Sequence, residues 1–214
     1  MPPERLVRWV SGFGERHGTE ELTVVREPGR PDVVRVTGAD GARADLEVPW
    51  SSLPAGDDPL AALVEHAARP RTAFLLLVRR GGFAAGVART GHLLDHSVGS
   101  RHVQGRTAAG GWSQQRFARR RAGQAAVLED AAVQTARRLL DRLPAADLPE
   151  VVVRGGDRRL VDAVLTDPRL RPLADLPRSP LLDVRDPRLA VLEDTAQRAR
   201  AVRVRLTDPP PPTS

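Results

Sequence analysis

The sequence predicts a globular α/β protein, and three observations carry this prediction. Residues 73–78 form a continuous apolar run, short enough for a strand that is buried on both faces. From residue 114 to about 143, apolar residues recur along one side of a helix, and Pro144 lies just beyond its end. Strand-like and helix-like segments then alternate. This alternation is typical of an α/β layer architecture.

Residues 1–58 are expected to form a small N-terminal region made of a short helix and an antiparallel β-meander. Leu6, Val10 and Phe13 recur at helical spacing, which predicts an amphipathic helix over residues 3–16. The Ala39-Asp40-Gly41 sequence is a hairpin signal. The strands expected in the meander are residues 22–26, 33–37 and 44–48.

Residues 59–206 are expected to form the α/β domain itself. Residues 207–214 are expected to be a disordered tail, because they contain four consecutive prolines. In chain order, the domain is expected to contain a helix at 59–68, strands at 73–78 and 83–89, an extended segment at 92–104, the long helix at 114–143, a strand at 151–153, a helix at 157–165, a strand at 181–184 and a final helix from 187 to about 205.

The composition favours a polyanionic partner. All 33 Lys and Arg residues are arginine, against 27 acidic residues, which gives a net charge of +6 and a pI near 11.3. Nucleic acid is the partner that such a charge indicates. The chain has no cysteine, which excludes disulfides, thiol nucleophiles and thiolate zinc sites.

Export and membrane insertion are not expected. The N-terminus carries charges where a signal peptide needs an unbroken apolar run. No stretch of about 18 apolar residues occurs, as a membrane-spanning helix would require. The sequence therefore indicates a cytoplasmic protein without a membrane partner.

Metal, nucleotide and serine-hydrolase sites have only weak support. His92 and His96 would share one face of a strand, but Asp95 would point to the opposite face, so ordinary polar positions are favoured over a metal site. The glycine pairs at 81–82 and 155–156 are not followed by the Gly-Lys-Ser/Thr of a P-loop. No serine lies in a Gly-x-Ser-x-Gly elbow. We therefore expect neither a metal nor a cofactor.

The most informative segment runs from Gly105 to Arg121. It joins a glycine pair, a glutamine pair and a dense arginine cluster. A glycine pair lets the backbone approach a ligand closely. The arginines stand where the long helix begins, and positive charge there opposes the helix dipole, which favours anions. The pattern indicates either an anionic partner, such as RNA, or a solvated basic face.

Residues 110–121 read Gly-Gly-Trp-Ser-Gln-Gln-Arg-Phe-Ala-Arg-Arg-Arg. This string resembles the VLRF family, the release-factor-like peptidyl-tRNA hydrolases of ribosome quality control, and specifically its actinobacterial branch. That family is related to the catalytic domain of archaeal and eukaryotic peptide-chain release factors, whose hallmark is a Gly-Gly-Gln loop. The resemblance implies an RNase H-like mixed sheet flanked by helices over residues 59–206, with the catalytic loop at 105–115.

The chain departs from the release-factor pattern at one point. Trp112 and Ser113 stand between the glycine pair and the first glutamine. In the VLRF relatives the glutamine follows a Gly-Gly-Ser or similar triplet, so Gln114 needs one extra loop residue to reach the catalytic place and Gln115 needs two. The comparison favours Gln114 but leaves both glutamines open.

The resemblance implies a metal-independent, cofactor-free peptidyl-tRNA hydrolase that acts on stalled or split ribosomes. Its partners would be the ribosomal RNA of the large subunit and peptidyl-tRNA, and the protein is expected to be a monomer. The implied catalytic set is Gly110, Gly111, Ser113, Gln114 and Gln115. The implied RNA-binding set is Arg106, Trp112, Arg116, Arg119, Arg120 and Arg121.

Two other functions stay open from the sequence. The chain could be a ribosome- or RNA-binding module that keeps the fold and the basic face without hydrolysis. It could also be a metal-dependent nuclease, because the RNase H-like architecture also hosts nucleases that use clustered carboxylates. Ester cleavage and chelator sensitivity distinguish these functions.

Overall fold

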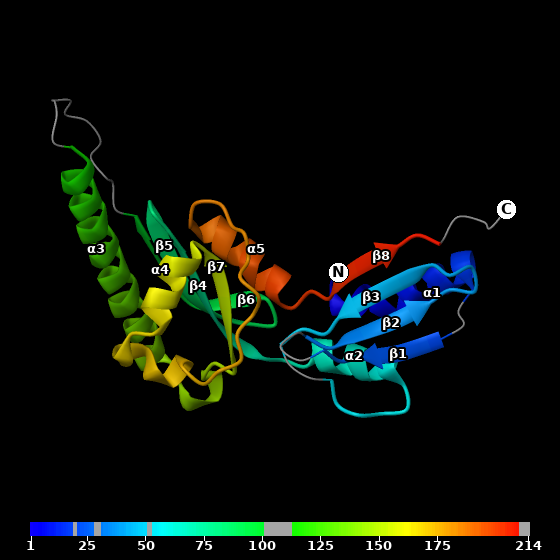
Figure 1. Cartoon of the computed structure of the whole chain (residues 1–214). Helices are drawn as coiled ribbons and strands as arrows, with labels where there is room; N and C mark the ends of the chain where they lie inside the picture. Colours follow the sequence, from blue (N-terminus) through cyan, green and yellow to red (C-terminus); the bar gives the residue numbers. More distant parts are fainter. Residues whose placement is uncertain (19–20, 28–30, 51–52, 101–112, 210–214) are drawn as a thin grey trace. The chain divides into compact units, whose positions relative to one another are not determined.

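The computed structural model describes residues 1–18, 21–27, 31–50, 53–100 and 113–209, with the backbone alone for residues 113–122 (Figure 1). The chain divides into two compact units. Unit 1 comprises Met1–Pro70 and Arg198–Ser214, and unit 2 comprises Arg71–Gln197.

Unit 1 contains a four-stranded antiparallel sheet and the N-terminal helices. The sheet order is β1-β2-β3-β8, and one face packs against a core that includes Leu6, Phe13 and Leu63. The predicted N-terminal helix and β-meander are confirmed. The elements are η1 (Pro3–Arg5), α1 (Leu6–His17), β1 (Glu21–Val25), β2 (Val33–Thr37), β3 (Arg43–Glu47), α2 (Pro59–Ala68) and β8 (Arg203–Thr207).

Strand β8 corrects the prediction of a helix that continues to about residue 205. The helix ends at Ala199, and Val202 is fully buried in the core of unit 1. Beyond it, Val204 pairs with Leu46 in the register of the sheet. The Arg-Val-Arg-Leu-Thr sequence of β8 alternates with period two, which is the strand pattern.

The grouping of elements also differs from the expected division at residue 58. Helix α2 belongs to unit 1, because Leu63 and Ala67 are buried in the same core as α1. Strand β8 belongs to unit 1 as well, although unit 2 precedes it in the chain. Both ends of the sequence therefore contribute to one sheet.

Unit 2 is built on a mixed sheet of order β6-β5-β4-β7. Strands β4 (Thr72–Arg79), β5 (Gly82–Arg89) and β6 (His92–Ser100) pair antiparallel, and β7 (Val151–Gly156) pairs parallel with β4. The predicted central strand is β4, in which only Arg79 is exposed. The predicted strand at 181–184 is wrong, because this segment forms only an isolated bridge between Leu182 and Gly155.

Helices cover both faces of this sheet (Figure 1). One face packs with α3 (Ser113–Arg142), α4 (Arg158–Leu165) and η3 (Pro168–Leu173) around a core that includes Phe74. On the other face, Leu192 of α5 (Leu189–Ala199) lies against Gly86 of β5. A short turn of helix, η2 (Ala145–Asp147), follows α3. The predicted α/β architecture with a helix-flanked mixed sheet is confirmed.

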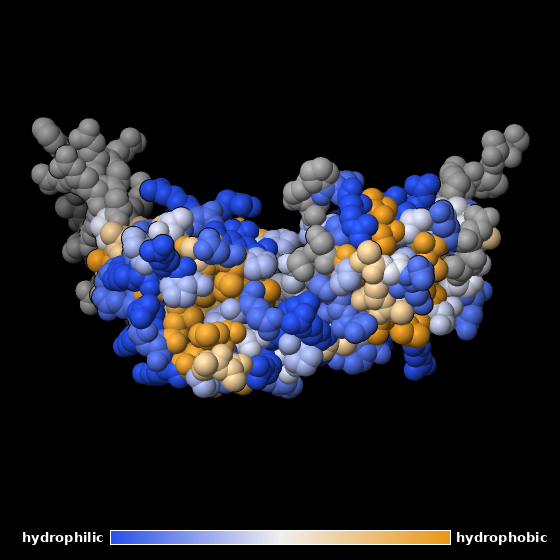
Figure 2. Space-filling model, turned by 90° about the horizontal axis from the view of Figure 1, so that it is seen from below, coloured by the Kyte–Doolittle hydropathy of each residue, from blue (hydrophilic) through white to orange (hydrophobic). Residues whose placement is uncertain are grey.

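Hydrophobic and hydrophilic residues are interspersed on the face seen in Figure 2. Among the described residues, no helix combines the length and apolar character that spanning a membrane requires.

The end of β7 depends on a glycine. Gly156 has a φ of 101°, and a Cβ at this position would lie 2.2 Å from the carbonyl oxygen of Val78. The next residue, Asp157, donates its backbone N–H to the same oxygen at 2.8 Å. The turn from β7 into α4 is thus held tightly against the end of β4.

Replacing this glycine tests the turn. We expect Gly156→Ala to destabilise the protein by about 2 kcal/mol or more, because alanine disfavours this φ and its Cβ meets backbone. Gly81→Ala is the matched control, since a Cβ at Gly81 meets nothing within 4 Å. Urea unfolding of both variants measures the difference. Equal stabilities would contradict the proposed constraint.

Candidate functional site

The candidate site is centred on the connection between β6 and α3. Residues 101–112 lie outside the described residues, and with them Arg106, Gly110, Gly111 and Trp112. Helix α3 begins at Ser113, so Gln114 and Gln115 lie in its first turn. The four arginines that follow, Arg116, Arg119, Arg120 and Arg121, belong to the next turns of the same helix.

The C-terminal half of α3 is buried in unit 2, and Ala125 is partly buried against the same core. Leu128 is 4% exposed, and the buried residues continue from it through Ala132 and Ala136 to Leu139. Gly123, Ala126 and Val127 are exposed. At 1.5 Å per residue, the glutamines stand roughly 20 Å beyond Leu128 along the helix. Figure 1 shows α3 lying along one face of the sheet of unit 2.

Polar contacts hold the buried half of α3 in place. Arg169 of η3 donates to Asp130 of α3 at 2.8 Å and also binds Asp167 at 2.8 Å. Gln134 donates to the other oxygen of Asp130 at 2.7 Å. Near the end of the helix, Arg142 lies 3.9 Å from Asp95 of β6. These contacts link α3 to both the sheet and η3.

The contacts of Arg169 shift the pKa values of the groups involved. The side chain and backbone N–H of Arg169 hydrogen-bond Asp167 and lower the pKa of its carboxyl from 3.8 to about 2. The hydrogen bonds to Asp167 and Asp130 raise the pKa of Arg169. Because both partners are partly exposed, solvent screens the pair and its net contribution to stability is modest.

The excess positive charge of the chain is concentrated around the site. Residues 96–128 contain six arginines and no acidic residue. Of the 33 arginines, 27 therefore lie elsewhere, and they equal the 27 acidic residues of the whole chain. The net charge of +6 thus belongs to this one segment, as expected for a surface that meets a polyanion.

The start of α3 has the chemistry to stabilise negative charge. The first four N–H groups of an α-helix have no partner within the helix, and the helix dipole places partial positive charge there. The two glutamines add neutral amide donors at the same end. Such donors can orient water or stabilise an oxyanion without changing their own protonation state.

The histidines and carboxylate of β6 do not converge. His92 and His96 are exposed, while Asp95 is half-buried on the side of Arg142. Asp95 also accepts a hydrogen bond from the backbone N–H of His96 at 2.8 Å. Among the described residues, no cluster of three or more His, Cys, Asp or Glu side chains could hold a metal ion.

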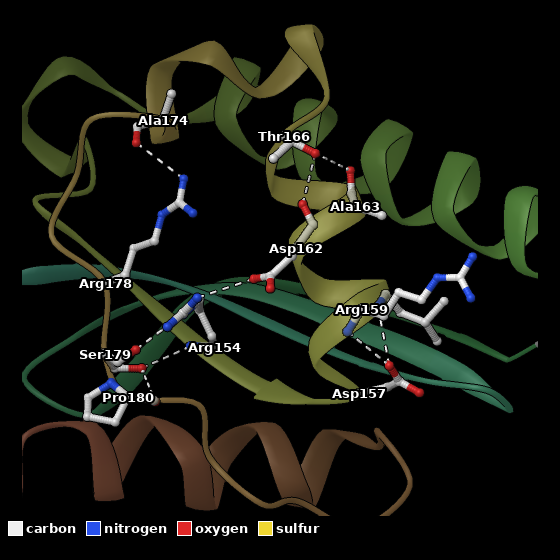
Figure 3. A network of polar contacts seen from close by, with 11 residues as sticks. Arg154, Asp157, Arg159, Asp162, Ala163, Thr166, Ala174, Arg178, Ser179 and Pro180 are labelled. Carbon is white, nitrogen blue, oxygen red and sulfur yellow. Dashed lines mark hydrogen bonds and ion pairs between the residues drawn. The ribbon is translucent and has the colours of Figure 1, made fainter.

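Sequence reasoning missed a polar cluster on β7 (Figure 3). Arg154 is 17% exposed and donates to the carbonyl of Ser179 at 3.2 Å and to Asp162 of α4 at 3.3 Å. Its backbone N–H donates to the Ser179 hydroxyl at 3.1 Å. The cluster joins α4 and the segment after η3 to the sheet. An arginine at the end of the Val151–Val153 run is the signal that could have identified it.

Comparisons with known proteins identify a family for this chain. A family model described as "Actinobacteria/chloroflexi VLRF1 release factor" matches residues 71–205, more than half of the chain. A search of curated proteins gives no match.

Two solved structures are distantly similar. The "Vms1 mitochondrial localization core" shares 9% identity over 80% of this chain and 75% of its own, with a TM-score of 0.42. The crystal structure of the archaeal translation termination factor aRF1 shares 13% identity over 93% of this chain and 70% of its own, with a TM-score of 0.43.

The Asp167–Arg169 contact predicts a pH dependence. A folded-state pKa that is lowered to about 2 contributes stability that is fully present above pH 3.8 and is lost as the pH falls through about 2. We expect Asp167→Asn to be less stable than wild type at pH 5, with the difference shrinking as the pH falls toward 2 and vanishing below it. Urea unfolding across this range measures it.

The control is Asp175→Asn, since Asp175 is exposed and has no hydrogen bond or ion pair among the described residues. Its difference from wild type should not follow the same profile. A difference for Asp167→Asn that stays constant from pH 5 to pH 2 would show that the carboxylate charge does not stabilise the fold.

Proposed function

Because the chain belongs to the Actinobacteria/chloroflexi VLRF1 release-factor family, we propose that it is a peptidyl-tRNA hydrolase. Its substrate would be the ester between a nascent peptide and tRNA on stalled or split ribosomes. The observation that carries the proposal is the glycine and glutamine string at 110–115, which leads into the start of α3.

The chemistry demands little from the protein. The ester of peptidyl-tRNA is intrinsically activated, so a catalyst mainly has to place a water molecule and stabilise the developing oxyanion. Glutamine is a poor proton acceptor near neutral pH, so its role would be hydrogen bonding rather than general base catalysis. Gly110 and Gly111 would let the loop approach the ester closely.

We favour Gln114 over Gln115 as the catalytic glutamine. Successive positions on an α-helix are turned about 100° from each other, so the two residues cannot occupy one place at the ester. Gln114 lies nearer to the glycine pair, as the glutamine does in the family pattern. Ser113 precedes it as the first residue of α3.

The basic residues around the loop would bind RNA. The proposed contacts of Arg106, Arg116, Arg119, Arg120 and Arg121 are with phosphates, which give affinity and orientation without reading sequence. Trp112 would stack on a base, a contact that contributes roughly 1 to 3 kcal/mol. The concentration of net charge in residues 96–128 supports this assignment.

Substitution of each glutamine tests the reaction. Purified protein is incubated with large ribosomal subunits that carry labelled peptidyl-tRNA, and peptide release is followed. We expect Gln114→Ala to lower the rate roughly 100-fold or more, the loss typical of removing an oxyanion donor. Gln115→Ala is the matched control and should retain most of the activity. The reverse pattern would make Gln115 the catalytic residue.

The same assay separates the alternative functions. If wild type binds the subunits but the peptide stays on its tRNA, the chain is an RNA-binding module and the hydrolase proposal fails. Cleavage of the RNA backbone that a chelator abolishes would instead indicate a metal-dependent nuclease. Chelator concentrations must leave the magnesium of the subunits in place.

The N-terminal half of α3 should matter for activity beyond its side chains. We expect Ala126→Pro to lower peptide release at least tenfold, because proline breaks the helix between Leu128 and the glutamines and misplaces the loop. The control is Ala126→Gln, which keeps the helix. Thermal unfolding of unit 2 checks that the buried half is intact. Full activity of the proline variant would contradict a positioning role for α3.

A further inference from the structure

Two turns of unit 2 lie side by side at one end of its sheet. The β4–β5 turn starts at Arg79, and the β7–α4 turn runs through Gly156. Val78 pairs with Gly156, and the N–H of Asp157 donates to the Val78 carbonyl at 2.8 Å. A Cβ on Gly156 would lie 3.1 Å from the Cγ of Arg79. The two turns therefore form one continuous surface.

This surface carries four exposed arginines, which we call the turn arginines: Arg79, Arg80, Arg158 and Arg159. Arg79 donates to the carbonyl of Val184. No hydrogen bond or ion pair of the other three side chains joins them to a described residue. In Figure 3, the guanidinium of Arg159 extends away from the contacts that surround it.

The neighbouring acids do not neutralise the turn arginines. Asp157 caps α4 and accepts hydrogen bonds from the backbone N–H groups of Arg159 and Leu160 at 3.0 and 3.4 Å. Asp183 is fully exposed, and the one ion pair that it forms with a described residue is with Arg79, at 4.0 Å. Three of the four guanidinium groups are thus available to an anion in solvent.

The turn arginines lie at the end of the sheet from which the candidate loop departs. Gly82, next to the β4–β5 turn, pairs with Ser100, the last residue of β6. Paired strands are about 5 Å apart, so this turn adjoins the point where the loop segment begins. Along α3, the glutamines stand roughly 20 Å from the buried Leu128.

We propose that the turn arginines bind the phosphate backbone of tRNA, on the stem next to its acceptor end. This inference rests on the proposed function, which puts the ester of peptidyl-tRNA at the glutamines. The 3′ end of tRNA is a short single strand, so its duplex stem begins some distance from the ester. A basic surface set back from the glutamines suits that stem.

The chemistry of the surface favours a phosphate backbone over a protein partner. Arginine presents a planar fork of donors that matches phosphate oxygens in a bidentate manner. Between Arg80 and β5 the surface offers glycine rather than the apolar side chains that a protein interface buries at its centre. Phosphate contacts of this kind orient RNA without reading its sequence.

The test measures binding of full-length protein to deacylated tRNA across a range of salt concentrations. The variant is Arg80→Gln with Arg159→Gln. The matched control is Arg138→Gln with Arg171→Gln, two exposed arginines on the buried half of α3 and on η3. We expect the variant to bind roughly tenfold or more weakly near 0.1 M salt, with the salt slope reduced by about 2. The control should match wild type.

Because deacylated tRNA has no ester, binding is read independently of hydrolysis. Wild type that binds tRNA in this manner but releases no peptide would refute the hydrolase and leave the tRNA surface standing. Equal binding by the variant and the control would overturn the surface, as would a wild type that does not bind tRNA at low salt. A loss seen only with large subunits would assign these arginines to ribosomal RNA and also overturn the proposal.

Discussion

The packing of α3 against the sheet of unit 2 is the contact on which the candidate site depends. The helix spans 30 residues, and its buried part, from Leu128 to Leu139, anchors the whole helix in unit 2. Ala132 and Ala136 let the helix approach the strands closely, while Leu128 and Leu139 fill the space around them. Full burial of a leucine side chain contributes about 1.5–3 kcal/mol. Arg169 and Arg142 then fix the helix against η3 and β6.

Unit 1 shows a second constraint, because its two sequence segments must meet. The amino group of Met1 donates to the carbonyl of Val202 at 2.7 Å, and Arg200 pairs with Glu4. Partial burial lowers the pKa of the Met1 amino group, and the positive charge of the nearby Arg5 lowers it further. Strand β8 completes the sheet beside β3, where Val204 and Leu206 continue the apolar face of Leu46 and Ala44. The N-terminal residues alone would leave that edge of the sheet unpaired.

The sequence predicted the elements whose pattern is long and regular. The apolar run at 73–78 is β4, because a strand that is buried on both faces is continuously apolar. The segment from 114 to 143 is α3, because a helix that is buried along one side repeats its apolar residues at helical spacing. The end of α5 was harder to predict. Arginine and alanine at 198–201 suit either a helix or a turn, so only the pairing of Val204 with Leu46 identifies β8.

The residues of the candidate site were predicted from a sequence motif that resembles a known family, and not from a periodic pattern of apolar residues. The turn arginines could not have been grouped in this way. They are separated by almost eighty positions in the sequence, and only the Val78–Gly156 pairing brings the two turns together. Arg154 was missed for the same reason, because its partners Asp162 and Ser179 lie on other segments.

The topology of the chain also affects the order in which its two units can fold during synthesis. Unit 2 ends at Gln197, whereas the sheet of unit 1 needs β8, which ends at Thr207. Domains generally fold as units, the N-terminal one first during translation. Here the sheet of unit 1 is complete only once β8 has emerged, whereas all residues of unit 2 precede that strand. Unit 2 lies between the two segments of unit 1, so it can fold before the sheet of unit 1 is complete.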